Sequence, residues 1–183
     1  MSHELHRADA AGLVVRFAVL TVSDTRDVKT DRSGARIIEL IEQAGHRLVQ
    51  RRIVRDEPAQ LREAIDAMLD SSETDAVITT GGTGVAPRDH TADVVRPLLD
   101  TELPGFGELF RMLSFQQIGA AAMLSRAIAG LVRGKPLFAL PGSTAACELA
   151  LSRLILPETA HLLKLRRGNQ HAKPRSPGDH QGP

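Results

Sequence analysis

Short apolar runs recur along the first half of the chain, and each is followed by a polar loop. Residues 17–22 are apolar apart from one threonine, which is typical of a central strand in a parallel sheet. Further strands are expected over 46–54 and 75–80. Between the strands, apolar residues recur every three or four positions over 31–45 and 58–69, as on one face of a helix. Three strand–helix alternations predict an α/β fold with a mainly parallel central sheet.

Residues at the ends of these stretches agree with the predicted helices. Asp31 or Ser33 can act as the N-cap of the first helix, and Gly45 can end it. Pro58 stands near the first turn of the next helix, where its missing N–H has no cost.

The second half of the chain is harder to divide. Pro97 would interrupt a long helix between 91 and 100. The remaining expected elements are a helix over 106–113, short β-like stretches at 123–124 and 128–132, a strand over 136–140 and a last helical region to about 165. We therefore expect one domain over 13–167, a flexible leader at 1–12 and a disordered tail at 168–183.

Composition excludes several classes of function. The net charge of +1 argues against a dedicated nucleic-acid surface, and the absence of Trp and Tyr removes the stacking platforms of single-strand binders. No apolar run approaches the roughly 18 residues of a membrane span. With Cys147 as its one cysteine, the chain can form neither an internal disulfide nor a Cys-rich zinc site. We expect no nucleic-acid or membrane partner, and a cytoplasmic location is the default.

A glycine-rich loop follows the strand expected at 75–80. Thr80-Gly81-Gly82-Thr83-Gly84 places three glycines within four residues, so the backbone can bend sharply and its N–H groups can surround a phosphate. Arg88-Asp89-x-Thr91 then adds a cation and a carboxylate, and Asp89 is the kind of ligand that Mg²⁺ takes beside phosphate oxygens. The loop matches neither the Walker A nor the dinucleotide signature. A plain tight turn, with Asp89 as a helix cap or a partner of Arg88, is the alternative.

Polar residues stand at the carboxyl end of each expected parallel strand. They are Ser23-Asp24, Asp56, Thr80-Gly81 and Pro141-Gly142. Ligands bind outside the carboxyl ends of the strands in open α/β sheets, so this convergence predicts a binding site. Taken singly, each residue also has a structural explanation. Asp56, next to Glu57 and Pro58, fits a plain helix N-terminus, and Ser23 and Asp24 are equally ambiguous.

Seven short motifs follow one another along the chain: Thr21-Val22-Ser23-Asp24, Asp31-x-Ser33-Gly34, Thr80-Gly81-Gly82-Thr83-Gly84, Arg88-Asp89-x-Thr91, Pro104-Gly105-Phe106-Gly107-Glu108, Ser125-Arg126 and Leu140-Pro141-Gly142-Ser143. In type and order they resemble the MoaB/MogA family of molybdenum cofactor biosynthesis proteins. The resemblance runs from about Phe17 to Leu165. The segment 110–115 and the Pro-Gly-Ser-Thr sequence look more like the MoaB branch than the MogA branch.

This resemblance implies a three-layer α/β/α fold that binds molybdopterin, ATP and Mg²⁺. It implies an adenylyltransferase, in which the terminal phosphate of molybdopterin attacks the α-phosphate of ATP and pyrophosphate leaves. Asp56 and Asp89 match the two aspartates that matter for activity in the family, so we expect both to be catalytic and to hold the metal ion. The expected ligand contacts are Ser23, Asp24, Thr80, Gly81, Gly82, Thr83, Gly84, Ser125, Pro141, Gly142 and Ser143.

The resemblance also implies partners. The adenylylated product would pass to a MoeA-like molybdenum insertase, and the chain would form a homotrimer or a homohexamer. A non-catalytic molybdopterin-binding or assembly protein of the same pathway is the alternative function. An unrelated small-ligand binder on the same fold is a third interpretation.

Overall fold

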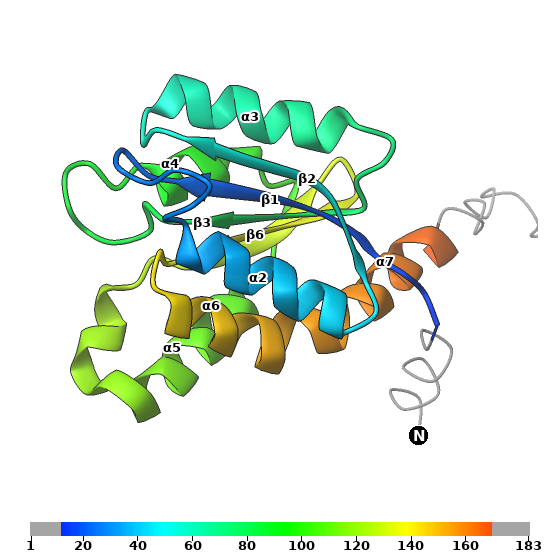
Figure 1. Cartoon of the computed structure of the whole chain (residues 1–183). Coiled ribbons are helices and arrows are strands. Elements are labelled where there is room, and N and C mark those ends of the chain that lie inside the picture. Colours follow the sequence, from blue (N-terminus) through cyan, green and yellow to red (C-terminus); the bar gives the residue numbers. More distant parts are fainter. Residues whose placement is uncertain (1–11, 170–183) are drawn as a thin grey trace, which may run out of the picture.

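Six strands form one sheet in the order β2-β1-β3-β6-β5-β4 in the computed structural model, which describes residues 12–169 (Figure 1). The strands are β1 (Arg16–Val22), β2 (Arg47–Val54), β3 (Ala76–Thr80), β4 (Thr101–Glu102), β5 (Ile128–Val132) and β6 (Lys135–Leu140). β1, β2, β3 and β6 run parallel, whereas β4 and β5 are antiparallel to their neighbours. The predicted mainly parallel sheet is confirmed.

Helices cover both faces of this sheet and give the predicted three layers (Figure 1). One face carries α3 (Pro58–Asp70) and α4 (Thr91–Val95), and the other carries α2 (Arg32–Gln43), α5 (Pro104–Ile118), α6 (Thr144–Ala150) and α7 (Leu156–Asn169). Alternate residues of β1 point to opposite faces. Phe17 and Val19 belong to the core beneath α2, whereas Ala18 and Leu20 belong to the core beneath α3. Within residues 12–169, no helix is long and apolar enough to cross a membrane.

The ends of α2 follow the sequence prediction. Asp31 is the N-cap, and its carboxylate accepts a hydrogen bond from the N–H of Gly34 at 2.9 Å. Gly45, just past the helix, has a φ of +78°, the left-handed conformation that glycine adopts without strain. Asp31 therefore fixes where this helix begins, close to the polar end of β1.

The second half of the chain departs from the prediction in three elements, one of which is β4, a strand that was not expected. Residues 123–124 are not β-like, because they close a 3₁₀ segment, Gly119–Leu124, that lies beside α5 where no strand is available for pairing. α5 itself continues to Ile118, beyond the predicted end. Pro97 acts as expected: α4 stops at Val95, and Arg96–Leu98 continues as a 3₁₀ turn because proline has no N–H to donate.

The predicted chain ends fall largely outside the described residues. The flexible leader at 1–12 lies outside them except for Gly12. Residues 168 and 169, where the predicted tail begins, are the last two residues of α7. The rest of the predicted tail, 170–183, lies outside the described residues. The π-helical turn Leu151–Ile155 and α7 after it close one face of the sheet.

Candidate functional site

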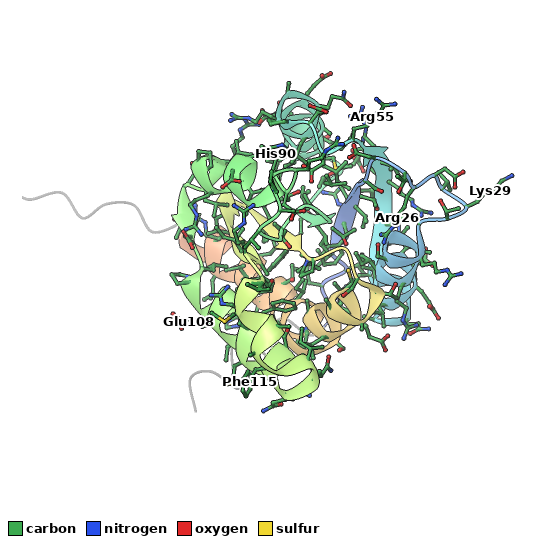
Figure 2. All side chains as sticks on the ribbon, turned by 90° about the vertical axis from the view of Figure 1, so that its left-hand side faces the viewer. Arg26, Lys29, Arg55, His90, Glu108 and Phe115 are labelled. Atoms are coloured by element: carbon green, nitrogen blue, oxygen red, sulfur yellow. The ribbon has the colours of Figure 1, made fainter. Side chains whose placement is uncertain are left out.

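The loops after β1, β2, β3 and β6 lie at the same edge of the sheet (Figure 1), and Figure 2 views the molecule from that side. Main-chain hydrogen bonds join the ends of neighbouring strands there. The N–H of Ser23 donates to Val54 O at 2.8 Å, and the N–H of Gly81 donates to Leu140 O at 3.0 Å. The strand ends that were predicted to converge do so.

The glycine loop is shaped by close contacts that leave no room for side chains. Gly81 and Gly82 have φ values of +106° and +64°. A Cβ on Gly81 would lie 2.2 Å from Val22 O, and a Cβ on Gly82 would lie 2.4 Å from Asp56 Oδ2. A Cβ on Gly84 would lie 2.6 Å from Asp89 Oδ2. Two of the three glycines are therefore needed because a carboxylate approaches each of them.

Asp56 is buried at the end of β2, against Gly82. Its Oδ1 accepts a hydrogen bond from the main-chain N–H of His90 at 3.2 Å. Burial raises the pKa of Asp56, and the negative charges of Asp89 and Asp24 act in the same direction. The hydrogen bond from His90 opposes this shift only in part. Asp56 is thus a carboxylate held close to two others, in a position that a bound cation would stabilise.

Asp89 is fixed within its own loop. Its Oδ2 accepts from the N–H of Ala86 at 2.9 Å, and its own N–H donates to Ala86 O at the same distance. Arg88, which was an open candidate for pairing with Asp89, instead pairs with Asp24 at 2.8 Å. The carboxylate of Asp89 is therefore left without an arginine partner among residues 12–169, while the charge of Asp24 is offset.

The threonine hydroxyls of this region divide into two groups. The Thr80 hydroxyl donates to Pro141 O at 2.9 Å, so its proton is not available to a phosphate oxygen. The hydroxyls of Thr79, Thr83 and Thr91 are buried and make no hydrogen bond to any described residue. A Cβ on Gly82 would also lie 2.4 Å from Thr91 Oγ1. Thr83 and Thr91 thus bring unused hydroxyl groups to the loop that holds Asp56 and Asp89.

The Pro141–Ser143 segment borders the glycine loop on its other side. A Cβ on Gly142 would lie 3.4 Å from the Cα of Gly81. Ser143 is the N-cap of α6, and its hydroxyl accepts from the N–H of Ala146 at 3.2 Å. Arg26, which the sequence analysis did not select, donates to Gly142 O at 3.2 Å. Ser23 accepts from the N–H of Arg26 at 3.2 Å, so the β1 loop and the β6 loop meet at this arginine.

Arg126 is a second arginine that sequence reasoning missed, although its neighbour Ser125 was selected. Its main-chain N–H donates to Thr83 O at 2.8 Å, and its Nε donates to Gly84 O at 2.7 Å. Its Nη2 donates to Asp89 O at 2.5 Å. The remaining Nη1 pairs with Asp93 at 2.9 Å. Arg126 therefore joins the C-terminal end of the glycine loop to the main chain of Asp89. The Ser-Arg pair was the only sequence signal for it.

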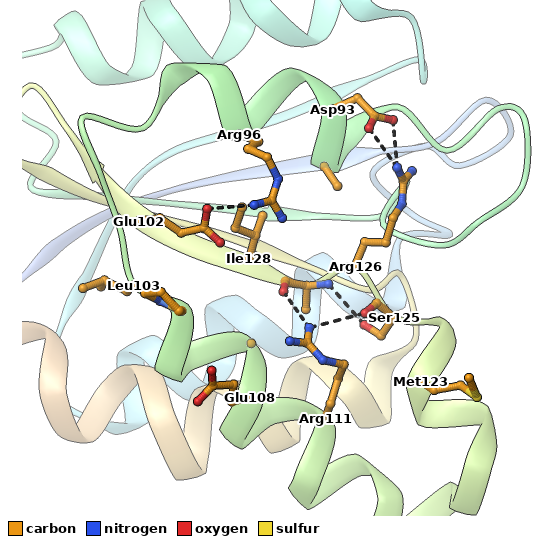
Figure 3. A pocket seen from close by; sticks show the side chains of 14 residues that line it. Asp93, Arg96, Glu102, Leu103, Glu108, Arg111, Met123, Ser125, Arg126 and Ile128 are labelled. Atoms are coloured by element: carbon orange, nitrogen blue, oxygen red, sulfur yellow. Dashed lines mark hydrogen bonds and ion pairs between the residues drawn. The ribbon is translucent and has the colours of Figure 1, made fainter.

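A cavity of about 410 Å³ lies beside Arg126, between α4, α5 and β5 (Figure 3). Arg96 and Glu102 form an ion pair at 2.8 Å on its wall. Arg111 Nη1 approaches Ser125 O at 3.5 Å and Ala127 O at 3.4 Å, so Ser125 faces this cavity together with Arg111. The structure thus separates Ser125 from the strand-end residues, with Arg126 between the two regions.

The residues that surround the glycine loop fit a phosphorylated ligand that brings its own cation. Among residues 12–169, no group of three or more His, Cys, Asp or Glu side chains is placed to hold a metal ion alone. Mg²⁺, however, is often bound by one or two carboxylates together with phosphate oxygens and water. Asp56 and Asp89 supply such carboxylates, and the unused hydroxyls of Thr83 and Thr91 lie in the same loop cluster.

Comparison with known proteins agrees with the motifs and the fold. The family model described as "Probable molybdopterin binding domain" matches residues 18–161. Molybdenum cofactor biosynthesis protein B of Halalkalibacterium halodurans is 50% identical over 165 residues, which cover 90% of this chain and 96% of that protein.

Solved structures show the same relationship. A crystal structure of molybdenum cofactor biosynthesis protein B has a TM-score of 0.84 and 44% identity, over 86% of this chain and 99% of the other. The tungsten cofactor synthesizing protein MoaB of Pyrococcus furiosus has a TM-score of 0.77 and 38% identity, with the same coverage of 86% and 99%. The chain therefore belongs to the MoaB/MogA family of molybdopterin binding domains, and to its MoaB branch.

Proposed function

We propose that this chain acts in molybdenum cofactor biosynthesis, and that it is a molybdopterin adenylyltransferase. The pathway is supported by relatives that carry the name molybdenum cofactor biosynthesis protein B. The chemistry is supported by one observation above all. Asp56 and Asp89, from loops far apart in the sequence, both approach glycines of a single loop at one edge of the sheet.

The proposed reaction is a displacement at phosphorus. A terminal phosphate oxygen of molybdopterin forms a bond to the α-phosphorus of ATP. The bond from that phosphorus to the bridging oxygen breaks, and pyrophosphate leaves with the electron pair. Such a transfer asks the protein mainly for positioning and for offsetting charge, and it needs no side-chain nucleophile. The single cysteine fits this, because Cys147 is buried and burial raises its pKa to about 11.

The residues have distinct roles in this proposal. Main-chain N–H groups of residues 82–84 bind phosphate oxygens, and the hydroxyls of Thr83 and Thr91 turn toward them. Asp56 and Asp89 hold Mg²⁺, which when bound offsets charge on the α-phosphate and the leaving pyrophosphate. Arg126 keeps the loop and Asp89 at a fixed separation. The cavity beside Arg126 is large enough to take part of one substrate.

The same pathway assignment includes partners. We propose that the adenylylated molybdopterin passes to a MoeA-like insertase, and that the chain works as a homotrimer or homohexamer. The self-association of the chain and the transfer of its product to the insertase can each be measured without the activity assay. A negative activity assay would therefore not refute either of them.

Pyrophosphate release from Mg-ATP and molybdopterin tests the proposed chemistry. We expect turnover by the wild type, and a loss of at least about 100-fold in Asp56→Asn and in Asp89→Asn, as when a group that acts in the transition state is removed. Molybdopterin binding should remain within a few-fold of wild type. Asp70→Asn is the matched control, since Asp70 ends α3 and pairs with Arg133, away from the site.

The outcomes of this experiment are distinguishable. If the wild type binds molybdopterin but releases no pyrophosphate, the transferase function is refuted and the non-catalytic assembly function takes its place. If the wild type does not bind molybdopterin at all, both proposed functions are refuted.

A further inference from the structure

Arg26, in the loop after β1, is held in place by only one nitrogen of its guanidinium group. Its Nη1 donates to the hydroxyl of Ser33 at 2.7 Å and to Gly142 O at 3.2 Å. Ser33 is buried in the first turn of α2, and its hydroxyl donates in turn to Oδ1 of Asp31 at 3.3 Å. Gly142 borders the glycine loop, since a Cβ on it would lie 3.4 Å from the Cα of Gly81. The guanidinium group of Arg26 is therefore fixed beside the glycine loop.

The other edge of the same group, Nε and Nη2, is free. Neither nitrogen makes a hydrogen bond to any residue within 12–169, and Arg26 is exposed. The N–H groups on this edge of an arginine are parallel, so that they can bind two oxygens of a phosphate or carboxylate group at once. A side chain that only joined two loops would need no more than the Nη1 contacts. The free edge is thus an unused anion-binding group at the edge of the sheet where ligands bind.

The positive charge of Arg26 is not offset by the acidic side chains around it. Each acidic residue of the stretch 24–31 is engaged elsewhere: Asp24 with Arg88 at 2.8 Å, Asp27 with the hydroxyl of Thr30 at 2.8 Å, and Asp31 with Arg51 at 2.9 Å. Arg26 has no ion-pair partner among residues 12–169. Its charge is therefore available to an anionic ligand.

Arg26 and the acidic pair lie toward opposite faces of the sheet, with the glycine loop between them. Asp56 and Asp89 precede α3 and α4, which cover one face. Arg26 contacts Ser33 of α2, which covers the other face. Figure 2, which views the ligand edge of the sheet, shows Arg26 and His90, the neighbour of Asp89, on this same side of the molecule. A ligand on the glycine loop thus has carboxylates on one side and a free arginine edge on the other.

We propose that Arg26 binds the terminal phosphate of molybdopterin, the group that attacks ATP. This inference rests on the proposed function and extends its binding site. In a transfer at phosphorus, the attacking and the leaving oxygens lie in line on opposite sides of the phosphorus atom. Because Asp56 and Asp89 hold Mg²⁺ beside the leaving pyrophosphate in that function, the attacking phosphate lies on the side of Arg26. Nε and Nη2 each donate a hydrogen bond to an oxygen that does not attack, and no proton is transferred.

The charge of the two substrates favours this assignment. A phosphate monoester carries a charge of about −1.5 to −2 at neutral pH and brings no metal ion with it. Two carboxylates repel such a group, so the side of the loop that holds Asp56 and Asp89 does not suit it. Mg-ATP arrives with part of its charge already offset by the metal ion. The substrate that needs a cation from the protein is therefore molybdopterin, and Arg26 supplies one.

Equilibrium binding of molybdopterin, without ATP or Mg²⁺, tests the assignment, and molybdopterin from which the phosphate has been removed is the comparison ligand. We expect Arg26→Gln to bind the phosphorylated form at least about tenfold more weakly than wild type, and the dephosphorylated form within about twofold of it. Arg26→Lys keeps the charge but not the two parallel donors, so its affinity for the phosphorylated form should lie between those of Arg26→Gln and wild type. Far-UV circular dichroism shows that each variant is folded.

Lys29→Gln is the matched control, because it removes the same charge from the same loop. Lys29 is exposed, and Figure 2 shows its side chain pointing outward at the rim of the molecule. This variant should bind both forms of molybdopterin as the wild type does. A loss as large as that of Arg26→Gln would mean that the net charge of the loop and not the free edge of Arg26 attracts the phosphate, and would overturn the proposal.

The use of two ligands separates a contact with the phosphate from an effect on the loops. If Arg26→Gln lost affinity for both forms alike, Arg26 would act only by joining the loops, and the proposal would be wrong. An unchanged affinity for the phosphorylated form would also overturn it. In steady-state kinetics, Arg26→Gln should raise the KM for molybdopterin by about tenfold or more and the KM for ATP by less than about threefold. The reverse pattern would place Arg26 on ATP and refute the assignment.

Failure of this assignment can be distinguished from failure of the proposed transferase. If the wild type distinguishes the two forms of molybdopterin through Arg26 but releases no pyrophosphate, the transferase is refuted and the assignment of Arg26 stands. If the wild type releases pyrophosphate while Arg26→Gln retains full affinity for the phosphorylated form, the assignment is refuted and the transferase stands.

Discussion

The main-chain N–H of His90 donates a hydrogen bond to Oδ1 of Asp56, with an N···O distance of 3.2 Å. Because Asp89 precedes His90 in the chain, this bond ties the segment that carries Asp89 to the end of β2, where Asp56 lies. The N–H of Thr91 donates in turn to Gly82 O at 2.9 Å. Two acidic loops and the glycine loop are thus one hydrogen-bonded unit, and displacing any of them disturbs the other two.

Asp56 should lower the free energy of unfolding at neutral pH. Burial raises its pKa above the 3.8 of an ordinary aspartate. The native state then binds a proton more readily than the unfolded state does, so stability is lost as the pH rises through the raised pKa. Asn cannot ionise, and its side-chain oxygen can still accept from His90. We expect Asp56→Asn to unfold at higher urea concentration than wild type at pH 7, with little difference near pH 3.

Asp70→Asn is the control for this measurement, because Asp70 is exposed and should show no such gain at pH 7. A variant Asp56→Asn that is less stable than wild type at pH 7 would mean that the carboxylate is held by favourable contacts instead. Combined with the expected loss of activity, the predicted result would show that Asp56 is kept for function at the expense of stability.

A methyl group at residue 82 should damage the site, whereas one at residue 105 should not. A Cβ on Gly82 would meet Asp56 Oδ2 and Thr91 Oγ1, each at 2.4 Å, and the φ of +64° adds strain. We expect Gly82→Ala to lose about 2–4 kcal/mol of stability and nearly all activity. Gly105→Ala meets nothing within 4 Å in the first turn of α5, and should be neutral or gain up to about 1 kcal/mol. Urea denaturation measures the stability of both variants. If Gly82→Ala and Gly105→Ala were equally stable, the proposed packing of the glycine loop would be contradicted.

Much of the fold could be predicted from local sequence. The strand over 17–22 is apolar because β1 is covered on both faces, and Pro58 and Asp31 mark helix starts at positions set by backbone chemistry alone. The convergence of strand ends followed from the parallel topology. The acidic pair was harder, since Asp56 by itself fits a helix N-terminus and only the resemblance selected it.

Other features depend on contacts that no local pattern reveals. Arg126 acts through main-chain oxygens of Gly84 and Asp89, which carry no sequence signature. Residues 123–124 are apolar, yet they close a 3₁₀ segment and lie where no strand can pair with them. The pairing of Arg88 with Asp24 depends on how two loops from different strands approach one another. Each case is decided by tertiary geometry and not by propensity.

Arg126 should position the site and not bind substrate directly. Its guanidinium reaches Gly84 O, Asp89 O and the carboxylate of Asp93, three acceptors that the single ammonium of lysine cannot span. We expect Arg126→Lys to lower kcat for pyrophosphate release by about 10-fold or more, with KM for ATP changed less than about threefold. Arg62→Lys is the matched control, because Arg62 pairs with Asp66 on α3 and lines neither the glycine loop nor the cavity. A change confined to KM would instead place Arg126 in substrate binding.

Asp31 should account for a large share of the stability that the fold loses at acidic pH. Burial acts to raise its pKa, but hydrogen bonds from the N–H of Gly34, from Arg51 and from Thr21 outweigh it and lower the pKa. A lowered pKa stabilises the fold above pH 3.8, and this contribution is lost as the pH falls through the pKa of the folded protein. Asp31→Ala removes a helix cap and also leaves Arg51 without its carboxylate partner, so we expect a loss of about 2–4 kcal/mol at pH 7.

Asp31 stabilises the fold as a helix cap and as the partner of Arg51, and Ser143→Ala serves to separate the two contributions. Ser143 caps α6 through one hydrogen bond and has no charged partner within residues 12–169. Loss of that cap alone should cost about 1 kcal/mol. We measure the free energy of unfolding by urea denaturation from pH 7 down to pH 3. The difference between wild type and Asp31→Ala should become smaller as the pH falls, whereas the difference between wild type and Ser143→Ala should stay constant. If the Asp31→Ala gap were equally constant, the carboxylate would stabilise the fold as a hydrogen-bond acceptor without a contribution from its charge, and the ion pair with Arg51 would have no measurable effect.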